Sequence, residues 1–175
     1  MPPTKLLAAL AASTLVLVAC GDDDDAAGDV DTESTSVEAD ESEPADTDSG
    51  VTVEGDFGES AGITVPAGLE VTELVTEDLI VGDGPEVQPG ATVTVHYHGV
   101  LLDGTTFDAS FGASPATFPL DGVIPGWTEG IPGMRVGGRR LLVIPSDLAY
   151  GPEGFGSVIP PDSPLVFVVD VLETS

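Results

Sequence analysis

Apolar residues fall in short runs over the C-terminal two thirds of the chain, and Gly and Pro separate these runs. The longest run, residues 91–101, is rich in Val and Thr and predicts a long β-strand. Asp103-Gly104 is a strong hairpin signal, and residues 105–107 are expected to return as the next strand. Residues 139–144 and 165–172 are also strand-like. These four runs predict an antiparallel sheet.

Weaker patterns complete the expected fold. Residues 69–75 alternate imperfectly and are expected to form an edge strand. Residues 123–131 are the candidate for a helix, which a Pro and a Gly inside the segment keep short. Residues 110–120 and 145–164 have the composition of loops. A single sheet could bury its apolar side by curling around the helix, so we expect an α+β fold: a half barrel of four to six antiparallel strands around one short helix.

The N-terminus carries an export pattern. Residues 1–19 hold one positive charge, at Lys5, and then small and apolar residues up to Leu17-Val18-Ala19-Cys20. This ending resembles the signal of bacterial lipoproteins, which implies cleavage before Cys20, acylation of its thiol, and an anchored location outside the cytoplasm. The alternative is an uncleaved membrane helix, but the apolar run is shorter than the roughly 20 residues that a span needs.

Residues 20–60 differ sharply in composition. The chain of 175 residues has a formal net charge of −27, and this segment supplies much of it without any Lys or Arg. Such a segment buries too little apolar surface to fold, so we expect a disordered tether that leads to a folded domain over 61–175. Calcium binding by Asp22–Asp25 is the alternative, although the run lacks the spaced ligands of a calcium loop. With only three Arg in the folded part, nucleic acid is not expected as a partner.

A series of short motifs runs through residues 95–167 in a fixed order. The motifs are Val95-His96-Tyr97-His98-Gly99, Asp103-Gly104, Phe107-Asp108-Ala109-Ser110, Val123-Ile124-Pro125-Gly126-Trp127, Ala149-Tyr150-Gly151, Ile159-Pro160-Pro161 and Leu165-Val166-Phe167. Together they resemble the FKBP-type peptidyl-prolyl cis/trans isomerases. The resemblance covers nearly all of the chain from Leu69 onward.

The resemblance implies an apolar cleft with Trp127 as its floor. Its expected catalytic residues are Tyr97, Phe107, Asp108, Ile124, Trp127 and Tyr150, and its expected substrate-binding residues are Val123, Phe155, Val158, Ile159 and Phe167. The Ile124 N–H and the Tyr150 hydroxyl would hold substrate carbonyls, and Asp108 would lie against the twisted carbonyl. The resemblance implies proline-containing exported polypeptides as substrates, macrolides such as rapamycin as ligands, and no cofactor. We expect a monomer.

Plainer interpretations stand beside these roles. Phe107 and Phe167 could be ordinary core aromatics, and Asp108 could cap a turn. His96 and His98 share one face of a strand, but no further His and no nearby Cys completes a metal site, so we expect no metal. The segment 111–117 lacks an Arg that the family commonly has there. This difference leaves open a second function, a cell-surface module that binds proline peptides without turnover.

Overall fold

The computed structural model describes residues 45–175. The predicted signal peptide, Cys20 and the first part of the predicted tether therefore lie outside the described residues. None of the helices in the described part is both long and apolar enough to cross a membrane. The elements in chain order are β1 (Ala45–Asp46), β2 (Thr52–Glu54), β3 (Gly62–Thr64), β4 (Val75–Ile80), β5 (Thr92–Leu101), β6 (Thr106–Ala109), β7 (Ala116–Pro119), η1 (Leu120–Gly122), α1 (Pro125–Gly130), β8 (Arg139–Ile144), η2 (Ser146–Leu148), η3 (Gly151–Glu153) and β9 (Leu165–Thr174), where η denotes a 3₁₀-helix.

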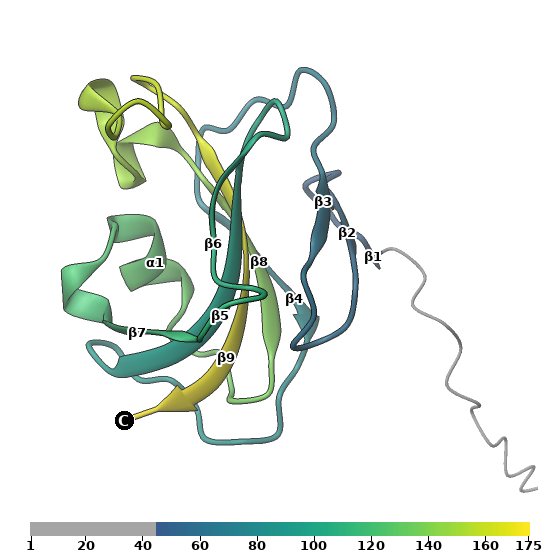
Figure 1. Ribbon diagram of the computed structural model, residues 1–175, viewed down its shortest axis with the longest axis vertical. Helices are drawn as coiled ribbons and strands as arrows, with labels where there is room; N and C mark the ends of the chain where they lie inside the picture. Colours follow the sequence, from purple (N-terminus) through teal and green to yellow (C-terminus); the bar gives the residue numbers. More distant parts are fainter. Residues whose placement is uncertain (1–44) are drawn as a thin grey trace, which may run out of the picture. The chain divides into compact units, whose positions relative to one another are not determined.

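The larger sheet has six strands, all paired antiparallel. Its order is β4-β8-β9-β5-β6, and β7 pairs with the first half of β5 while β6 pairs with the second half. The sheet curves, and α1 packs against one of its faces (Figure 1). This arrangement confirms the predicted α+β fold of a curled antiparallel sheet and one short helix.

The β5–β6 hairpin forms where the turn signal predicts it. Gly104 has a φ of +82°, a left-handed conformation that Gly adopts without a Cβ clash. The Asp103 carboxylate accepts a hydrogen bond of 2.8 Å from the Thr105 N–H, which closes the turn. The short turn places β6 directly beside β5.

Two of the loop and strand predictions are wrong. The first strand of the large sheet is Val75–Ile80 instead of residues 69–75, although it is an edge strand as predicted. Its pairing begins at Val75 opposite Val143, because β8 ends at the next residue, Ile144, and offers no partner to residues 69–73. The predicted loop 110–120 contains a strand, β7, whose Thr117 hydroxyl lies 3.0 Å from that of Thr94 on β5.

Residues 45–64 form a second, three-stranded sheet in the order β1-β2-β3, which we call the strap. The strap covers the face of the large sheet opposite α1 (Figure 1). Its Val51, Val53 and Ala61 are buried. The prediction that the disordered tether extends to residue 60 is therefore wrong from residue 45 onward, because these three apolar side chains give the acidic segment a core of its own.

The large sheet is consequently buried on both faces, which β9 shows most clearly. Phe167 and Val169 belong to the core beneath α1, whereas Val166 and Val168 belong to the core beneath the strap. Because successive side chains of a strand point to opposite faces, this division follows from the period of two. A nearly continuous apolar strand is typical of a sheet covered on both sides.

A buried ion pair fastens the strap to the sheet. The Arg139 guanidinium donates to both oxygens of Asp170, from Nε at 2.6 Å and from Nη2 at 2.8 Å. It also donates to the backbone carbonyls of Gly55 and Glu59 in the strap, and the Gly58 N–H donates to Asp170 at 2.6 Å. Arg139 is 1% exposed and Asp170 is fully buried, so the charges are compensated by each other and by the strap.

Candidate active site

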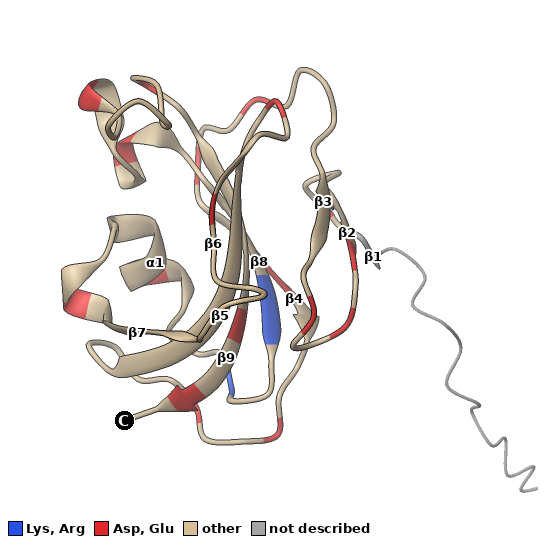
Figure 2. Cartoon of the chain, in the orientation of Figure 1, with Lys and Arg blue, Asp and Glu red and all other residues tan. Residues whose placement is uncertain are grey.

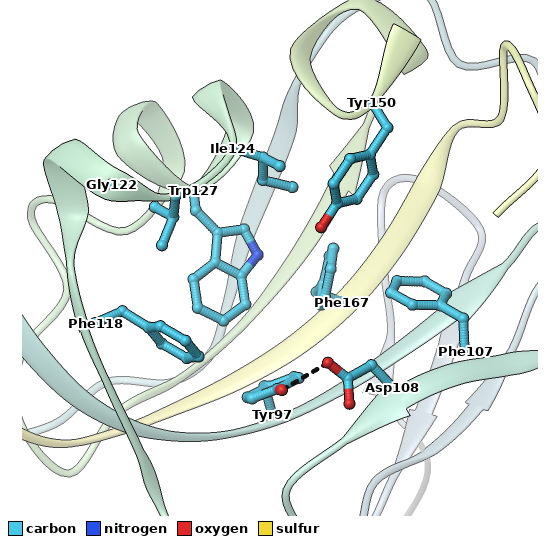
Figure 3. Close-up of a pocket in the computed structure, with 10 residues that line it drawn as sticks. Tyr97, Phe107, Asp108, Phe118, Gly122, Ile124, Trp127, Tyr150 and Phe167 are labelled. Carbon is cyan, nitrogen blue, oxygen red and sulfur yellow. Dashed lines mark hydrogen bonds between the residues drawn. The ribbon is translucent and has the colours of Figure 1, made fainter. Parts of the chain in front are cut away.

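A pocket of about 380 Å³ opens between the large sheet and the segments that contain α1, η2 and η3. Its walls are mostly aromatic and aliphatic, with one carboxylate and two phenol hydroxyls (Figure 3). The lining residues are Tyr97, Phe107, Asp108, Phe118, Gly122, Val123, Ile124, Trp127, Tyr150 and Phe167. A concave apolar surface with a few polar groups is typical of a small-ligand site.

Trp127 forms the base of the pocket and is 4% exposed. The indole meets the rings of Tyr97, Phe118 and Phe167 edge to face, at centroid distances of 5.5, 5.8 and 5.3 Å. Its Nε1 is buried without a hydrogen-bond partner among the described residues. Three ring contacts of this favourable geometry hold the indole in one orientation, so the base is rigid and apolar.

One wall of the pocket depends on a glycine. A Cβ at Gly99 would lie 2.6 Å from the Phe107 ring and 2.8 Å from the Phe167 ring, which is closer than carbon atoms approach. These two rings are themselves perpendicular, with centroids 5.3 Å apart. The absence of a side chain at Gly99 therefore lets both aromatics close over β5.

The polar groups of the pocket are positioned by hydrogen bonds across β5 and β6. The Tyr97 hydroxyl donates to Oδ2 of Asp108 at 2.7 Å. Behind them, the Tyr97 N–H donates to the Ser110 hydroxyl at 2.9 Å, and the Ser110 N–H donates to the Tyr97 carbonyl at 2.9 Å. The Asp108 carboxylate is thus fixed on the pocket wall without a basic partner among residues 45–175.

Both phenol hydroxyls remain protonated donors across the neutral range. Burial, together with the hydrogen bond to Asp108, raises the pKa of Tyr97 well above its usual value near 10. Burial and the Asp108 charge also raise the pKa of Tyr150. The Tyr150 hydroxyl points toward the pocket in Figure 3, where the one hydrogen bond drawn joins Tyr97 to Asp108. It can therefore donate to a ligand.

Ile124 presents its backbone at the rim. It is the N-cap of α1, and its carbonyl accepts the Trp127 N–H at 2.9 Å. Its own N–H precedes the helix and lies outside the helical hydrogen bonds. The helix spans Pro125–Gly130 and so confirms the short helix predicted within residues 123–131.

All six predicted catalytic residues line this one pocket, and Val123 and Phe167 line it as predicted. Three predicted substrate-binding residues do not: Ile159 is buried in the core, while Phe155 and Val158 are 57% and 50% exposed on the loop after η3. The Phe155 ring lies against the ring of the lining residue Tyr150, with centroids 4.9 Å apart and planes tilted by 35°. Their contact with a ligand stays a prediction.

Phe118 and Gly122 also line the pocket, and neither was among the predicted site residues. Phe118 lies on β7, where its pairing with Val93 turns the ring toward Trp127, and Gly122 ends η1, which follows β7. The apolar alternation Ala116, Phe118, Leu120 was the available signal.

The two histidines lie outside the pocket, on the strap side of β5. His98 Nδ1 is 2.7 Å from the Ala61 carbonyl, and His96 Nδ1 is 3.1 Å from the Ser110 hydroxyl. The His96 ring also stacks on Phe111 with centroids 5.1 Å apart, and the guanidinium carbon of Arg139 lies over the same Phe111 ring, 5.8 Å from its centroid. The histidines therefore connect the strap and the neighbouring loop to the sheet.

Comparisons with known proteins agree with this geometry. A family profile described as FKBP-type peptidyl-prolyl cis-trans isomerase matches residues 84–172. The chain is 49% identical over 112 residues to a probable FK506-binding protein of Corynebacterium glutamicum, covering 63% of this chain and 94% of that protein. It is 45% identical over 115 residues to an FK506-binding protein of Streptomyces anulatus, covering 63% of this chain and 93% of that one.

The solved structures give the same result. A crystal structure of a peptidyl-prolyl cis-trans isomerase from Pseudomonas syringae pv. tomato matches with a TM-score of 0.55 at 43% identity, covering 58% of this chain and 75% of that one. The strap, residues 45–64, precedes the segment that the family profile matches.

Proposed function

Because this chain belongs to the FKBP-type peptidyl-prolyl cis-trans isomerases, we propose that its aromatic pocket binds the X-Pro bond in its twisted state and that a lipid on Cys20 anchors the enzyme outside the cytoplasm. The isomerase activity is a property of the family, as is the binding of proline-containing peptides and macrolides. The proposal concerns which residues act and where.

The reaction requires rotation about a bond with partial double-bond character. Resonance sets a barrier of roughly 18–20 kcal/mol, and an X-Pro bond crosses it unaided in tens to hundreds of seconds. At the twisted geometry the resonance is lost, so the carbonyl is less polar than in the planar amide. An apolar pocket disfavours the planar amide more than the twisted one, and even a modest enzyme needs about 8 kcal/mol of such differential binding.

The pocket of this protein supplies that environment, and its aromatic lining is the observation that carries the proposal. The proline ring would rest on the indole of Trp127. The Ile124 N–H and the Tyr150 hydroxyl would hold the carbonyls on either side of the rotating bond. Asp108, oriented by the Tyr97 hydroxyl, would lie beside the rotating carbonyl. No covalent or proton-transfer step is needed, because only a torsion angle changes.

Two conservative substitutions test this assignment. Asp108→Asn in the purified protein is expected to lower kcat/KM for a proline peptide about tenfold, the effect of losing one charged hydrogen-bonding group. Tyr97→Phe keeps the ring but releases the carboxylate, so a loss of two- to tenfold is expected. The measurement is a proline-isomerisation rate assay.

Asp103→Asn is the matched control, since Asp103 is exposed in the hairpin turn and an amide oxygen can still accept from Thr105. It should retain the parental rate. A folded Asp108→Asn protein with full kcat/KM would remove Asp108 from the mechanism. Peptide affinity without acceleration in the parental protein would instead indicate a binding module.

The proposed location rests on the N-terminal sequence. Leu17-Val18-Ala19-Cys20 would direct acylation of Cys20, which places the enzyme where newly exported polypeptides fold. We expect the protein in the membrane fraction with Cys20 as a modified N-terminus, and we expect Cys20→Ala to shift it out of that fraction. Mass spectrometry of the membrane-bound form checks this, and a membrane form that still begins at Met1 would contradict it.

A further inference from the structure

We propose that the pocket selects prolines that have Lys or Arg close by in the sequence, because every exposed charged side chain within three residues of a pocket-lining residue is acidic. The inference rests on the proposed function, since it concerns the residues that flank a proline bound over Trp127. The apolar lining would bind the proline ring, and the negative charge around the lining would attract basic residues that flank the proline in the substrate.

The acidic residues lie in the segments that line the pocket or directly beside them in the chain. Asp108 is part of the lining, and four more exposed carboxylates lie within three residues along the chain of a lining residue. They are Asp121 beside Gly122, Glu129 after Trp127, and Asp147 and Glu153 on either side of Tyr150. All five side chains are exposed. Figure 2 shows red segments around α1 and on the η2–η3 segment, without blue among them.

The basic residues of the described chain are all occupied elsewhere. Arg139 is buried in its pair with Asp170. Arg140 is 12% exposed, pairs with Asp78 on the edge strand β4, and donates to the carbonyl of Gly130, the last residue of α1, at 2.7 Å. Arg135 lies before β8 and donates to the Gly84 carbonyl. None of the three lines the pocket, and the blue in Figure 2 lies at β8 and just before it.

The carboxylate on the pocket wall has capacity for a further partner. The Tyr97 hydroxyl uses Oδ2 of Asp108, and neither oxygen takes part in a salt bridge among residues 45–175. A substrate cation near this oxygen would gain the attraction of Asp108 and of the carboxylates around it. Clustered charge of one sign raises the local concentration of an oppositely charged ligand, and salt weakens this effect.

The test compares three peptides with the same X-Pro core and with Lys, Ala or Glu two residues to each side of it. At about 0.01 M ionic strength, where the Debye length is about 30 Å, we expect kcat/KM to be about tenfold higher for the Lys peptide than for the Glu peptide. At about 1 M, where the Debye length is about 3 Å, the ratio should fall to within about twofold. Each value is divided by that of the Ala peptide on the same protein, which cancels differences in folding.

A pair of double variants separates the pocket's charge from the charge of the whole protein. Asp147→Lys/Glu153→Lys is expected to bring the Lys-to-Glu ratio close to one. Glu54→Lys/Glu59→Lys makes the same change of charge at exposed positions of the strap, on the opposite face, and should leave the ratio as it is.

Equal rates on the Lys and Glu peptides in the parental protein would overturn the inference, and so would an equal loss of selectivity in both double variants. A protein that accelerates none of the three peptides would contradict the proposed function itself. The two failures are therefore distinguishable.

Discussion

Replacing Asp170 with Ala is expected to lower the free energy of unfolding by about 3–5 kcal/mol, because it leaves the Arg139 guanidinium buried without its counter-charge. The same change removes the acceptor of the Gly58 N–H and so loosens the strap. Urea denaturation measures the loss, and Trp127, the single tryptophan of the chain, provides the fluorescence signal.

The control for this prediction removes both charges at once. Arg139→Met/Asp170→Leu fills the space with apolar side chains, and buried pairs replaced in this way commonly cost little. We expect the double variant to recover more than half of the stability lost in Asp170→Ala. If the double variant lost as much free energy of unfolding as Asp170→Ala or more, the hydrogen bonds from Arg139 to the backbone carbonyls of Gly55 and Glu59 would contribute more to stability than the ion pair does.

Trp127→Ala should have the largest effect on activity. Truncating a buried aromatic anchor of a binding site typically costs 2 kcal/mol or more, which corresponds to a loss of about 30-fold or more in kcat/KM. It should also cost about 3–5 kcal/mol of stability, because three aromatic rings lose their common neighbour. The isomerisation assay is therefore run at a temperature at which circular dichroism shows the variant to be folded.

Two further variants make this result specific. Trp127→Phe retains an aromatic base and should lose less activity than the alanine variant. Phe57→Ala is the same type of truncation at a half-buried strap position away from the pocket, so its kcat/KM should match the parental value. A folded Trp127→Ala protein with full activity would show that the indole is only part of the core.

The centre of the fold and of the site could be predicted from sequence because local signals agree there. The strand β5 is marked by its Val, Thr and aromatic content, and the turn at Gly104 fixes where β6 returns. Once this hairpin is set, Tyr97 and Asp108 must lie near each other, and their hydrogen bond follows. Trp127 stood out as the single tryptophan at the start of a short helix.

The strap could not be predicted from its composition, because its acidic surface resembles a disordered segment. The signal lay in the partner sheet, where Leu141, Val143, Val166 and Val168 are apolar on the face away from α1. An apolar face of this kind must be shielded from water by another part of the chain. Which segment shields it depends on contacts between residues far apart in the sequence, which local patterns do not reveal. Phe155 and Val158 were placed in the site by a sequence motif, but their side chains are exposed outside the pocket lining. A motif fixes where a loop lies in the sequence and does not fix the direction of its side chains.

The strap also determines the face of the large sheet at which a force on the N-terminal side of the domain would act. Residue 45, where the described chain begins, lies behind the large sheet, while the opening over Trp127 is on the α1 side (Figure 1). A force pulling on residue 45 would act first on the short β1–β2 pairing and on the Arg139–Asp170 ion pair, and only afterwards on β5 or α1. A force applied at residue 45 would therefore act on the face of the large sheet opposite the pocket, and the pocket would keep its geometry.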